Sequence, residues 1–455
     1  MALLGAFMPG LRPTMMLGHG YMIGQLAVIL VLLVLNAVGL NMAFASAAFV
    51  LGTLALASAI AWWLRSTGQG MAWPDRRALW HLLWLLPLAW FLFERGSVLT
   101  SELMLRPLYA WDSWMNWVPK AVVWFHHATL TPFVSAAEWL QAGTDAGVYT
   151  LGNYRAAEYP PGVPLLLLWV MLGAGTTDHT LLYLPWLLLP ASLALALWGH
   201  LRSRAAAPWL AALAVYAWLS QPLPNTHATL GGYADPWLAV AFCLGVLALD
   251  EWQRIGGVRY AVLALVMAVA CALFKVPGLA FACMLVAAVV VVAVRPPRRL
   301  ILWGVAAAAS SLFVGLLVGM WPGLWETGKA MIVLDMPGVL PELEIQLTPF
   351  LPYLGQTMFV YANWHMLWLL VVVTFSFGLV TRGREAFHGA APLLFLAGLG
   401  FLVFVFGFTH YFLQVDKGVT FHRAMSYLSP LAVFVSFQQL ISAFRDAGDP
   451  KASQR

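Results

Sequence analysis

Long apolar segments recur along almost the whole chain, and they restrict its fold more than any other feature. A helix needs about 20 consecutive apolar residues to cross the hydrocarbon core of a membrane. Of all residues, 62% are hydrophobic, and the mean hydropathy is +0.81. The sequence therefore predicts an all-α, polytopic integral membrane protein with about twelve transmembrane helices in one membrane domain, residues 1–455. These helices are expected near 22–41, 44–64, 79–94, 180–199, 208–220, 236–250, 259–274, 277–294, 299–320, 357–380, 390–408 and 424–443.

Two further segments affect the predicted topology. Residues 162–174 are apolar but too short to cross a membrane unaided, so they are expected to form a partial or surface helix. The first segment, 22–41, is followed by AFASA, which resembles a signal-peptide cleavage site, but its length favours an uncleaved transmembrane helix.

The distribution of charge gives the predicted orientation. With 162–174 left out of the crossings, most lysines and arginines lie in short connections and at the two ends of the chain, on one side. That side is expected to be cytoplasmic. Most acidic residues fall on the opposite, external side, which carries two long loops, 95–161 and 321–356. The basic residues that give the net charge of +5 therefore lie mainly on the predicted cytoplasmic side. No nucleic-acid partner is expected.

The first long loop contains YAWDSWMNWVPK, in which Asp112, Asn116 and Lys120 are spaced four residues apart. On a helix they would form one polar stripe flanked by Trp111 and Trp114. A proline at position 119 would kink or end that helix, which places the stripe on a short surface helix. The tryptophans are typical of an interfacial aromatic belt, but an acid between them is costly near lipid and also fits a carbohydrate site.

Two later stretches carry further acids on the same side. In EYPPG, Glu158 and Tyr159 precede a proline pair that would lead into a half-helix. In GGYADPW, Gly231 and Gly232 allow a tight backbone path, and Asp235 directly precedes a membrane helix. Asp235 could cap that helix or serve as a site acid facing the first loop.

Basic residues retained on the external side are candidates for anion binding. Lys275 in FKVPG is predicted at the external end of a hairpin of two helices, where it would either snorkel to headgroups or hold a phosphate. His422 and Arg423 enter the last helix and would act either as interfacial anchors or as a second anion-binding pair.

These stretches together resemble the GT-C superfamily of polytopic glycosyltransferases, especially its bacterial members related to protein O-mannosyltransferases and lipid A aminoarabinose transferases. Such enzymes place an acid in a long first external loop, a Tyr/His-Pro-Pro stretch at a helix start, a second acid in a later loop and bases near the membrane surface. The resemblance is carried by AWDSW, EYPPG, GGYADP, FKVPG and HRAMSYLSPL.

The resemblance implies a GT-C-like fold with periplasmic juxtamembrane helices, in the bacterial inner membrane, acting in glycan biosynthesis of the cell envelope. The implied reaction is an inverting transfer of a sugar from a polyprenyl-phosphate donor to a hydroxyl of a glycan, lipid or protein acceptor. No cofactor is certain, and a divalent cation at Asp112 and Asp235 stays open. The expected residues are Asp112 and Asp235 for catalysis, Lys275, Arg423, His422 and Lys120 for the donor phosphate, and Trp111, Trp114, Asn116, Glu158, Tyr159 and Tyr233 for sugar or acceptor.

Two other functions remain open at this point. A lipid-linked saccharide ligase or polymerase would need the same external acids and bases. A transporter or flippase of glycosylated or anionic lipid would also use external bases, although transporters usually carry inverted repeats and broken helices at the midplane, which the sequence does not show.

Overall fold

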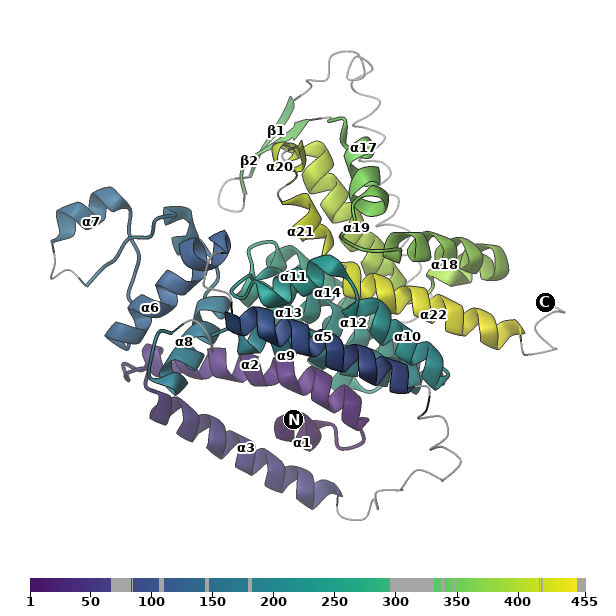
Figure 1. Ribbon diagram of the computed structural model, residues 1–455, viewed down its shortest axis with the longest axis horizontal. Helices are drawn as coiled ribbons and strands as arrows, with labels where there is room; N and C mark the ends of the chain where they lie inside the picture. Colours follow the sequence, from purple (N-terminus) through teal and green to yellow (C-terminus); the bar gives the residue numbers. More distant parts are fainter. Residues whose placement is uncertain are drawn as a thin grey trace. The chain divides into compact units, whose positions relative to one another are not determined.

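The computed structural model describes residues 1–66, 83, 85–105, 110–143, 147–178, 182–294, 331–336, 340–346, 348–416, 418 and 420–447. The chain forms two compact units (Figure 1). Unit 1 comprises Met1–Gly245 and Val266–Ala282, and unit 2 comprises Val246–Leu265 and Cys283–Arg455. Each unit is built mainly from helices, and the expectation of one membrane domain over the whole chain stays a prediction.

Most elements of the N-terminal half belong to unit 1. They are α1 (Ala2–Phe7), α2 (Pro13–Ala37), α3 (Phe44–Ser66), α5 (Leu85–Leu105), the π-helical turn η2 (Ser113–Trp117), α6 (Val118–His127), α7 (Ala136–Ala142), the 3₁₀ turn η3 (Tyr154–Glu158), α8 (Gly162–Ala174), α9 (Leu184–Ser203), α10 (Pro208–Leu219) and α11 (Pro222–Thr229).

Three helices contribute residues to both units: α12 (Asp235–Ile255), α13 (Val258–Phe274) and α14 (Gly278–Ala293). The remaining elements belong to unit 2. They are β1 (Met331–Met336), β2 (Leu340–Gln346), α17 (Phe350–Gly355), the π-helical turn η4 (Gln356–Val360), α18 (Leu367–Arg382), the 3₁₀ turn η5 (Gly383–Phe387), α19 (Ala390–Phe408), α20 (Phe412–Asp416), α21 (Phe421–Met425) and α22 (Ser429–Ala447).

Among the described residues, 5 helices are long and apolar enough to cross a membrane. They are α2, α3, α9, the continuous stretch of α18 and η5, and α19. Shorter apolar helices accompany them, among them α8, α10, α13 and α14. A helical membrane protein is thus confirmed, whereas a total of about twelve spans stays a prediction. The predicted helix 299–320 lies outside the described residues.

The first membrane helix begins earlier than its apolar run suggested. α2 starts at Pro13, and His19, which makes the early part of the segment look polar, is fully buried against α9. The Nε2 atoms of His19 and His200 lie 2.9 Å apart. A Cβ on Gly18 would lie only 2.6 Å from that of Ala196, so the two helices approach closely at this point. Figure 1 shows α2 and α9 side by side.

The short helix α8 has the predicted bounds but a different environment. It begins directly after the proline pair, and Pro164 lies in its first turn, as the sequence indicated. Its side chains from Val163 to Leu168 are buried. α8 packs against α2, α3 and α6. The expectation of a short helix is confirmed, and the first half of α8 is buried within unit 1 while its last residues are exposed. Whether it crosses a membrane only in part stays a prediction.

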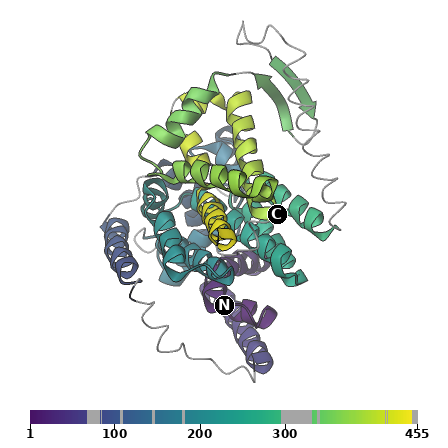
Figure 2. The ribbon, with the colours of Figure 1, turned by 90° about the vertical axis from the view of Figure 1, so that its right-hand side faces the viewer.

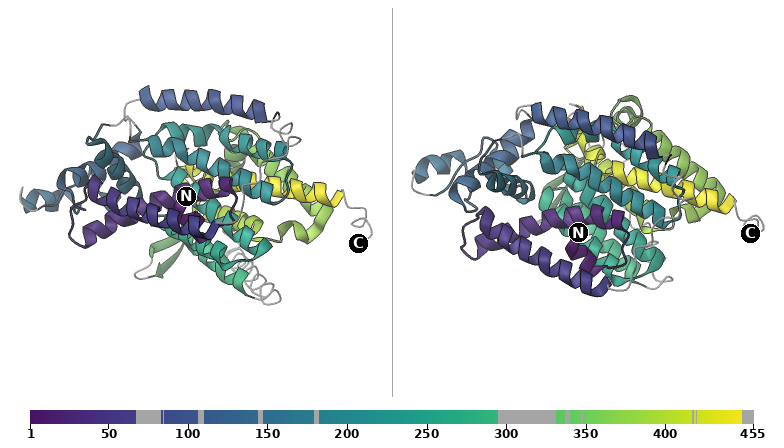
Figure 3. Two further views of the ribbon diagram at one scale, coloured as in Figure 1. Left: turned by 90° about the horizontal axis from the view of Figure 1, so that it is seen from below. Right: turned by 60° about the horizontal axis from the view of Figure 1, so that its bottom comes forward.

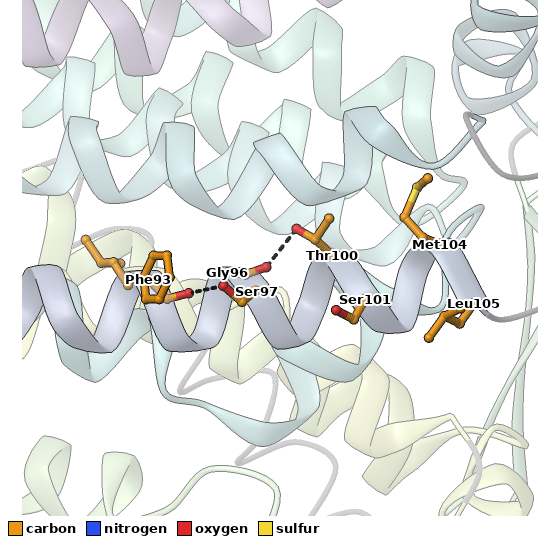
Figure 4. A pocket seen from close by; sticks show the side chains of 8 residues that line it. Phe93, Gly96, Ser97, Thr100, Ser101, Met104 and Leu105 are labelled. Atoms are coloured by element: carbon orange, nitrogen blue, oxygen red, sulfur yellow. Dashed lines mark hydrogen bonds between the residues drawn. The ribbon is translucent and has the colours of Figure 1, made fainter.

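α5 extends 11 residues beyond the predicted end of its apolar run, so the region predicted as the first external loop begins as helix. The hydroxyls of Ser97 and Thr100 donate to the carbonyls of Phe93 and Gly96, at 2.8 and 2.7 Å, so these polar groups are satisfied within the helix (Figure 4). α5 packs on α10 and α11 and runs along an outer side of unit 1 (Figure 3). An open hollow of about 720 Å³ follows it, lined by Leu92, Phe93, Gly96, Ser97, Thr100, Ser101, Met104 and Leu105.

Unit 2 departs from the all-α prediction at several of its described positions. β1 and β2 pair antiparallel within the region predicted as the second long external loop (Figure 2). The predicted helix 357–380 begins only at Leu367, because π-helical turn η4 and a break at His365, with φ of 49°, precede it. The last predicted helix is likewise divided, into α21 and α22.

A polar cluster ties the helices of unit 2 together. Asp250 is buried and accepts from Gln438 at 3.3 Å, and Gln439 accepts from Arg382 at 3.2 Å while donating to the Ala386 carbonyl at 2.6 Å. These bonds join α12, α22, α18 and η5, and they satisfy several polar groups that would otherwise be costly in an apolar interior.

The α13–α14 hairpin depends on a glycine. A Cβ on Gly278 would lie 1.8 Å from the carbonyl oxygen of Cys271, so Gly278→Ala should force the two helices apart. We expect a clear fall in the midpoint of thermal unfolding of the purified protein. The matched control is Gly24→Ala in α2, where the added Cβ would have no atom within 4 Å other than the neighbouring backbone of its own helix. That exchange should leave the midpoint unchanged or raise it, since alanine is the better helix former. Equal midpoints for the two variants would contradict this packing.

Candidate functional site

The predicted polar stripe is present, although not as a regular α-helix. Asp112 directly precedes the π-helical turn η2, and Pro119 lies in the first turn of α6, where its missing N–H costs nothing. Pro119 therefore lies where the π-helical turn passes into α6, and the helical run 111–127 continues past it without ending. Asn116 Nδ2 donates to Asp112 Oδ1 at 3.4 Å, so the first two members of the stripe contact each other. Asp112 is half-buried, and Asn116 is buried.

Lys120, the third member of the stripe, points into the protein. Its side chain is buried, and Nζ donates to the carbonyls of Ala157 and Tyr159 at 3.0 and 3.2 Å. Burial lowers the pKa of Lys120 to about 8. These two bonds tie α6 to η3 and to the segment that leads into α8. This geometry gives Lys120 a structural task that the spacing of the stripe did not indicate.

The start of α8 lies against the end of α13. A Cβ on Gly162 would come within 2.5 Å of the Leu273 carbonyl and 3.1 Å of the Phe274 ring. Only a glycine permits this approach. The proline-pair segment is therefore placed next to the turn that carries Lys275.

Asp235 and Lys275 form a direct ion pair, with Lys275 Nζ 2.5 Å from Asp235 Oδ1. As predicted, Asp235 begins α12 and Lys275 lies in the turn between α13 and α14. The Asp235 side chain is 0% exposed and that of Lys275 is 19% exposed. The cation is thus the accessible member of the pair, which suits an anionic ligand. Close to the pair in the sequence, Trp237 of α12 stacks on Phe274 of α13, with ring centroids 5.1 Å apart.

The two glycines bring the Asp235 segment back to the Asp112 segment. The hydroxyl of Ser113 donates to the Gly231 carbonyl. A Cβ on Gly232, whose φ is 91°, would lie 2.3 Å from Ser113 Oγ, and one on Gly231 would lie 2.0 Å from the Tyr183 ring. The tight backbone path predicted for the glycine pair is therefore confirmed.

These contacts connect four stretches of unit 1 in a closed ring, which we call the contact ring. The Asp112 stretch meets η3 through Lys120, η3 leads to α8, α8 meets the end of α13, Lys275 pairs with Asp235, and the glycine pair returns to Ser113. Asp112, Asp235 and Lys275 are therefore brought into one region by residues that lie far apart in the sequence.

The aromatic residues divide into exposed and buried sets. Trp111 and Trp114 are 57% and 41% exposed and meet edge to face, with ring centroids 5.0 Å apart. Trp117, in contrast, is buried and packs on Tyr159 at 5.4 Å. Two of the three tryptophans are thus available for a ligand or for lipid, whereas the third belongs to the core.

The other predicted contact residues of unit 1 have distinct surroundings. Glu158 is exposed at the end of η3. The Tyr233 ring stacks on buried His227 at 5.1 Å, and its carbonyl accepts from Trp186 Nε1 at 2.7 Å. Tyr233 is therefore fixed between the glycine pair and Asp235.

The two remaining predicted bases, His422 and Arg423, lie on α21 in unit 2. Asn363 Nδ2 lies 3.4 Å from His422 Nδ1, and because an amide nitrogen only donates, Nδ1 is the acceptor. Burial lowers the pKa of His422, which favours the neutral ring. A neutral His422 can donate a hydrogen bond from Nε2 but adds no positive charge. Both residues are half-buried.

Within the described residues, no group of three or more histidine, cysteine, aspartate or glutamate side chains is arranged to hold a metal ion. Asp235 is engaged by Lys275. The role of a divalent cation stays an open expectation. Comparisons with protein-family models, with curated proteins and with solved structures found no match to this chain.

Sequence reasoning missed several residues in the contact ring or next to it. Ser113, Gly162, Asn153 and His227 have no distinctive spacing, and their partners lie in other elements. Only the glycine pair and the proline pair carried a local signal, because both restrict the backbone itself.

Removing one partner of the Asp235–Lys275 pair should be strongly destabilising, because the other charge remains buried. Lys275→Met is expected to lower the free energy of unfolding by about 3 kcal/mol. Adding Asp235→Asn to that variant should then cost much less than it does in the wild-type protein. Denaturant unfolding of the four proteins in detergent would measure this coupling. Additive effects would show that the ion pair contributes no specific stability.

The pH dependence of stability tests the environment of Lys120. An exposed lysine in the unfolded chain has a pKa of about 10.4, whereas that of folded Lys120 is about 8. Between these values the unfolded chain binds more protons, so stability should rise as the pH increases from about 8 to about 10. Comparing thermal midpoints with those of Lys120→Gln isolates this contribution, because the variant should lack it. The same rise in both proteins would rule out a buried charged amine.

Proposed function

We propose that the protein is a membrane glycosyltransferase that moves a sugar from a polyprenyl-phosphate donor to an acceptor hydroxyl, with inversion at the anomeric carbon. The observation that carries this proposal is the contact ring, which brings Asp112 and the Asp235–Lys275 pair into one region of unit 1. The resemblance to the GT-C superfamily supports it, because the stretches that carry the resemblance are the stretches that form most of the ring.

In the proposed reaction the acceptor oxygen attacks the anomeric carbon, and the bond from that carbon to the phosphate oxygen breaks. Asp112 takes the hydroxyl proton as general base, or orients the hydroxyl. The polyprenyl phosphate leaves with the bonding electrons, and Lys275 stabilises its negative charge. Lys275 suits this role because it is the exposed member of its ion pair. Asp235 holds the lysine in place.

The exposed tryptophan pair provides a surface for the sugar. Trp111 and Trp114 lie on either side of Asp112 in the sequence and both present ring surface. Aromatic faces next to a carboxylate suit a carbohydrate, whose C–H groups pack on the ring while its hydroxyls bind the acid. Glu158, Tyr159 and Tyr233 are the further proposed contacts to sugar or acceptor. Asn116 and Lys120 are buried and bonded within unit 1, so they hold the site in place. Arg423 and His422 lie in unit 2, and their binding of the donor phosphate stays a prediction.

The proposal includes the finer features implied by the resemblance. These are a GT-C-like fold with about twelve spans, a bacterial inner membrane, cytoplasmic termini and a site on the periplasmic face. The apolar helices support a membrane location. A lipid-linked saccharide ligase or polymerase would use the same chemistry with a larger donor.

The direct test uses purified protein in liposomes with a panel of radiolabelled polyprenyl-phosphate sugars, and it measures release of the sugar from the lipid. Asp112→Asn should lower the rate at least about 100-fold, because the amide cannot accept the proton. The control is Glu138→Gln in the same external loop, where the acid only caps α7 through Ser135 at 2.9 and 2.8 Å.

Full activity of Asp112→Asn would contradict the role of Asp112 as base. If the wild-type protein moved the intact donor across the bilayer without releasing sugar, it would be a transporter, and the proposed transferase activity would be wrong.

A further inference from the structure

A chain of two amide side chains connects η3 to Asp112. Asn153, the residue before η3, donates from Nδ2 to Asn116 Oδ1 at 2.8 Å. Asn116 in turn donates from Nδ2 to Asp112 Oδ1 at 3.4 Å. Asn116 is only 5% exposed, so bulk water does not compete for its amide group. The sequence analysis gave Asn153 no role.

The charge on Asp112 fixes the direction of both bonds. An ionised carboxylate only accepts hydrogen bonds, so Asn116 must present its NH₂ group to Asp112. Its oxygen then faces Asn153, which must donate. The reverse orientation would place the Asn116 oxygen against the carboxylate. Although amide orientations are normally ambiguous, here the carboxylate determines them, and each bond polarises the next.

We propose that Asn153 is a positioning residue for Asp112 and acts through Asn116. This inference rests on the proposed role of Asp112 as the base. By holding the Asn116 oxygen, Asn153 keeps the Asn116 NH₂ group on Oδ1 of the carboxylate. This fixes the orientation of the carboxylate that takes the proton from the acceptor hydroxyl.

The position of η3 does not depend on Asn153 alone. Lys120 holds the carbonyls of Ala157 and Tyr159, so the segment stays attached to α6 when the Asn153 amide is removed. Asn153→Leu should therefore fold, and its effect should be confined to the relay.

The kinetic test measures release of radiolabelled sugar from a polyprenyl-phosphate hexose. Asn153→Leu should lower kcat about tenfold, with little change in KM, because the Asn116 amide is no longer held against the carboxylate. In an Asn116→Leu background, the same exchange should have no further effect, since the relay is already broken. Asn153→Gln, which keeps a donor, should restore part of the rate.

The matched control is Asn36→Leu. Asn36 is also half-buried in unit 1, and its amide oxygen accepts from the Leu130 N–H at 2.8 Å, away from the contact ring. This variant should lose some stability but keep the kcat of the wild-type protein. If Asn153→Leu and Asn36→Leu gave the same kcat, or if the effect of Asn153→Leu persisted without Asn116, the proposal would be wrong.

A second readout requires no substrate. The carboxylate stretching band of Asp112 can be assigned by infrared difference spectroscopy against Asp112→Asn. Asn153→Leu should shift this band and Asn36→Leu should not, because only the former weakens the bond to Oδ1. A shifted band in a protein that releases no sugar would support the relay while the proposed function failed. An unshifted band would overturn the relay whatever the activity.

Discussion

The buried ion pair between Asp235 and Lys275 is the interaction on which the rest of the candidate site depends. A fully buried carboxylate is stable only with a partner, and the partner here comes from the turn between α13 and α14. That turn has its position because Gly278 lets the two helices meet, and Gly162 lets α8 approach the end of α13. One electrostatic requirement therefore fixes the start of α12, the α13–α14 hairpin and, through them, the entry to α8.

The contact ring separates residues that hold the site from residues that can meet a ligand. Lys120, Asn116, Ser113 and Asp235 are buried and bonded to other parts of unit 1. Trp111, Trp114, Glu158 and part of Lys275 are accessible. The proposed sugar transfer needs such a division, because reacting groups must be held in place before the substrate arrives.

The sequence predicted those features that the local backbone determines. The apolar runs located most of the described helices, the proline pair marked the start of α8, and the glycine pair indicated a close approach. Lys275 was correctly placed in a helical hairpin because apolar sequence flanks it on both sides.

What sequence could not supply was the identity of the residues that each side chain contacts. Lys120 looked like a surface base because spacing shows which face of a helix a residue occupies, but not whether another segment covers that face. The buried contact of His19 and the relay from Asn153 likewise depend on partners distant in sequence, His200 and Asn116.

The central claim is that the contact ring binds a polyprenyl-phosphate sugar with its anomeric carbon facing Asp112. A structure of the protein in nanodiscs loaded with such a donor would test it most directly. The account predicts the phosphate within hydrogen-bonding distance of Lys275 Nζ and the sugar between Asp112 and the Trp111–Trp114 pair. A donor bound with its phosphate remote from Lys275, or with the sugar turned away from Asp112, would contradict it.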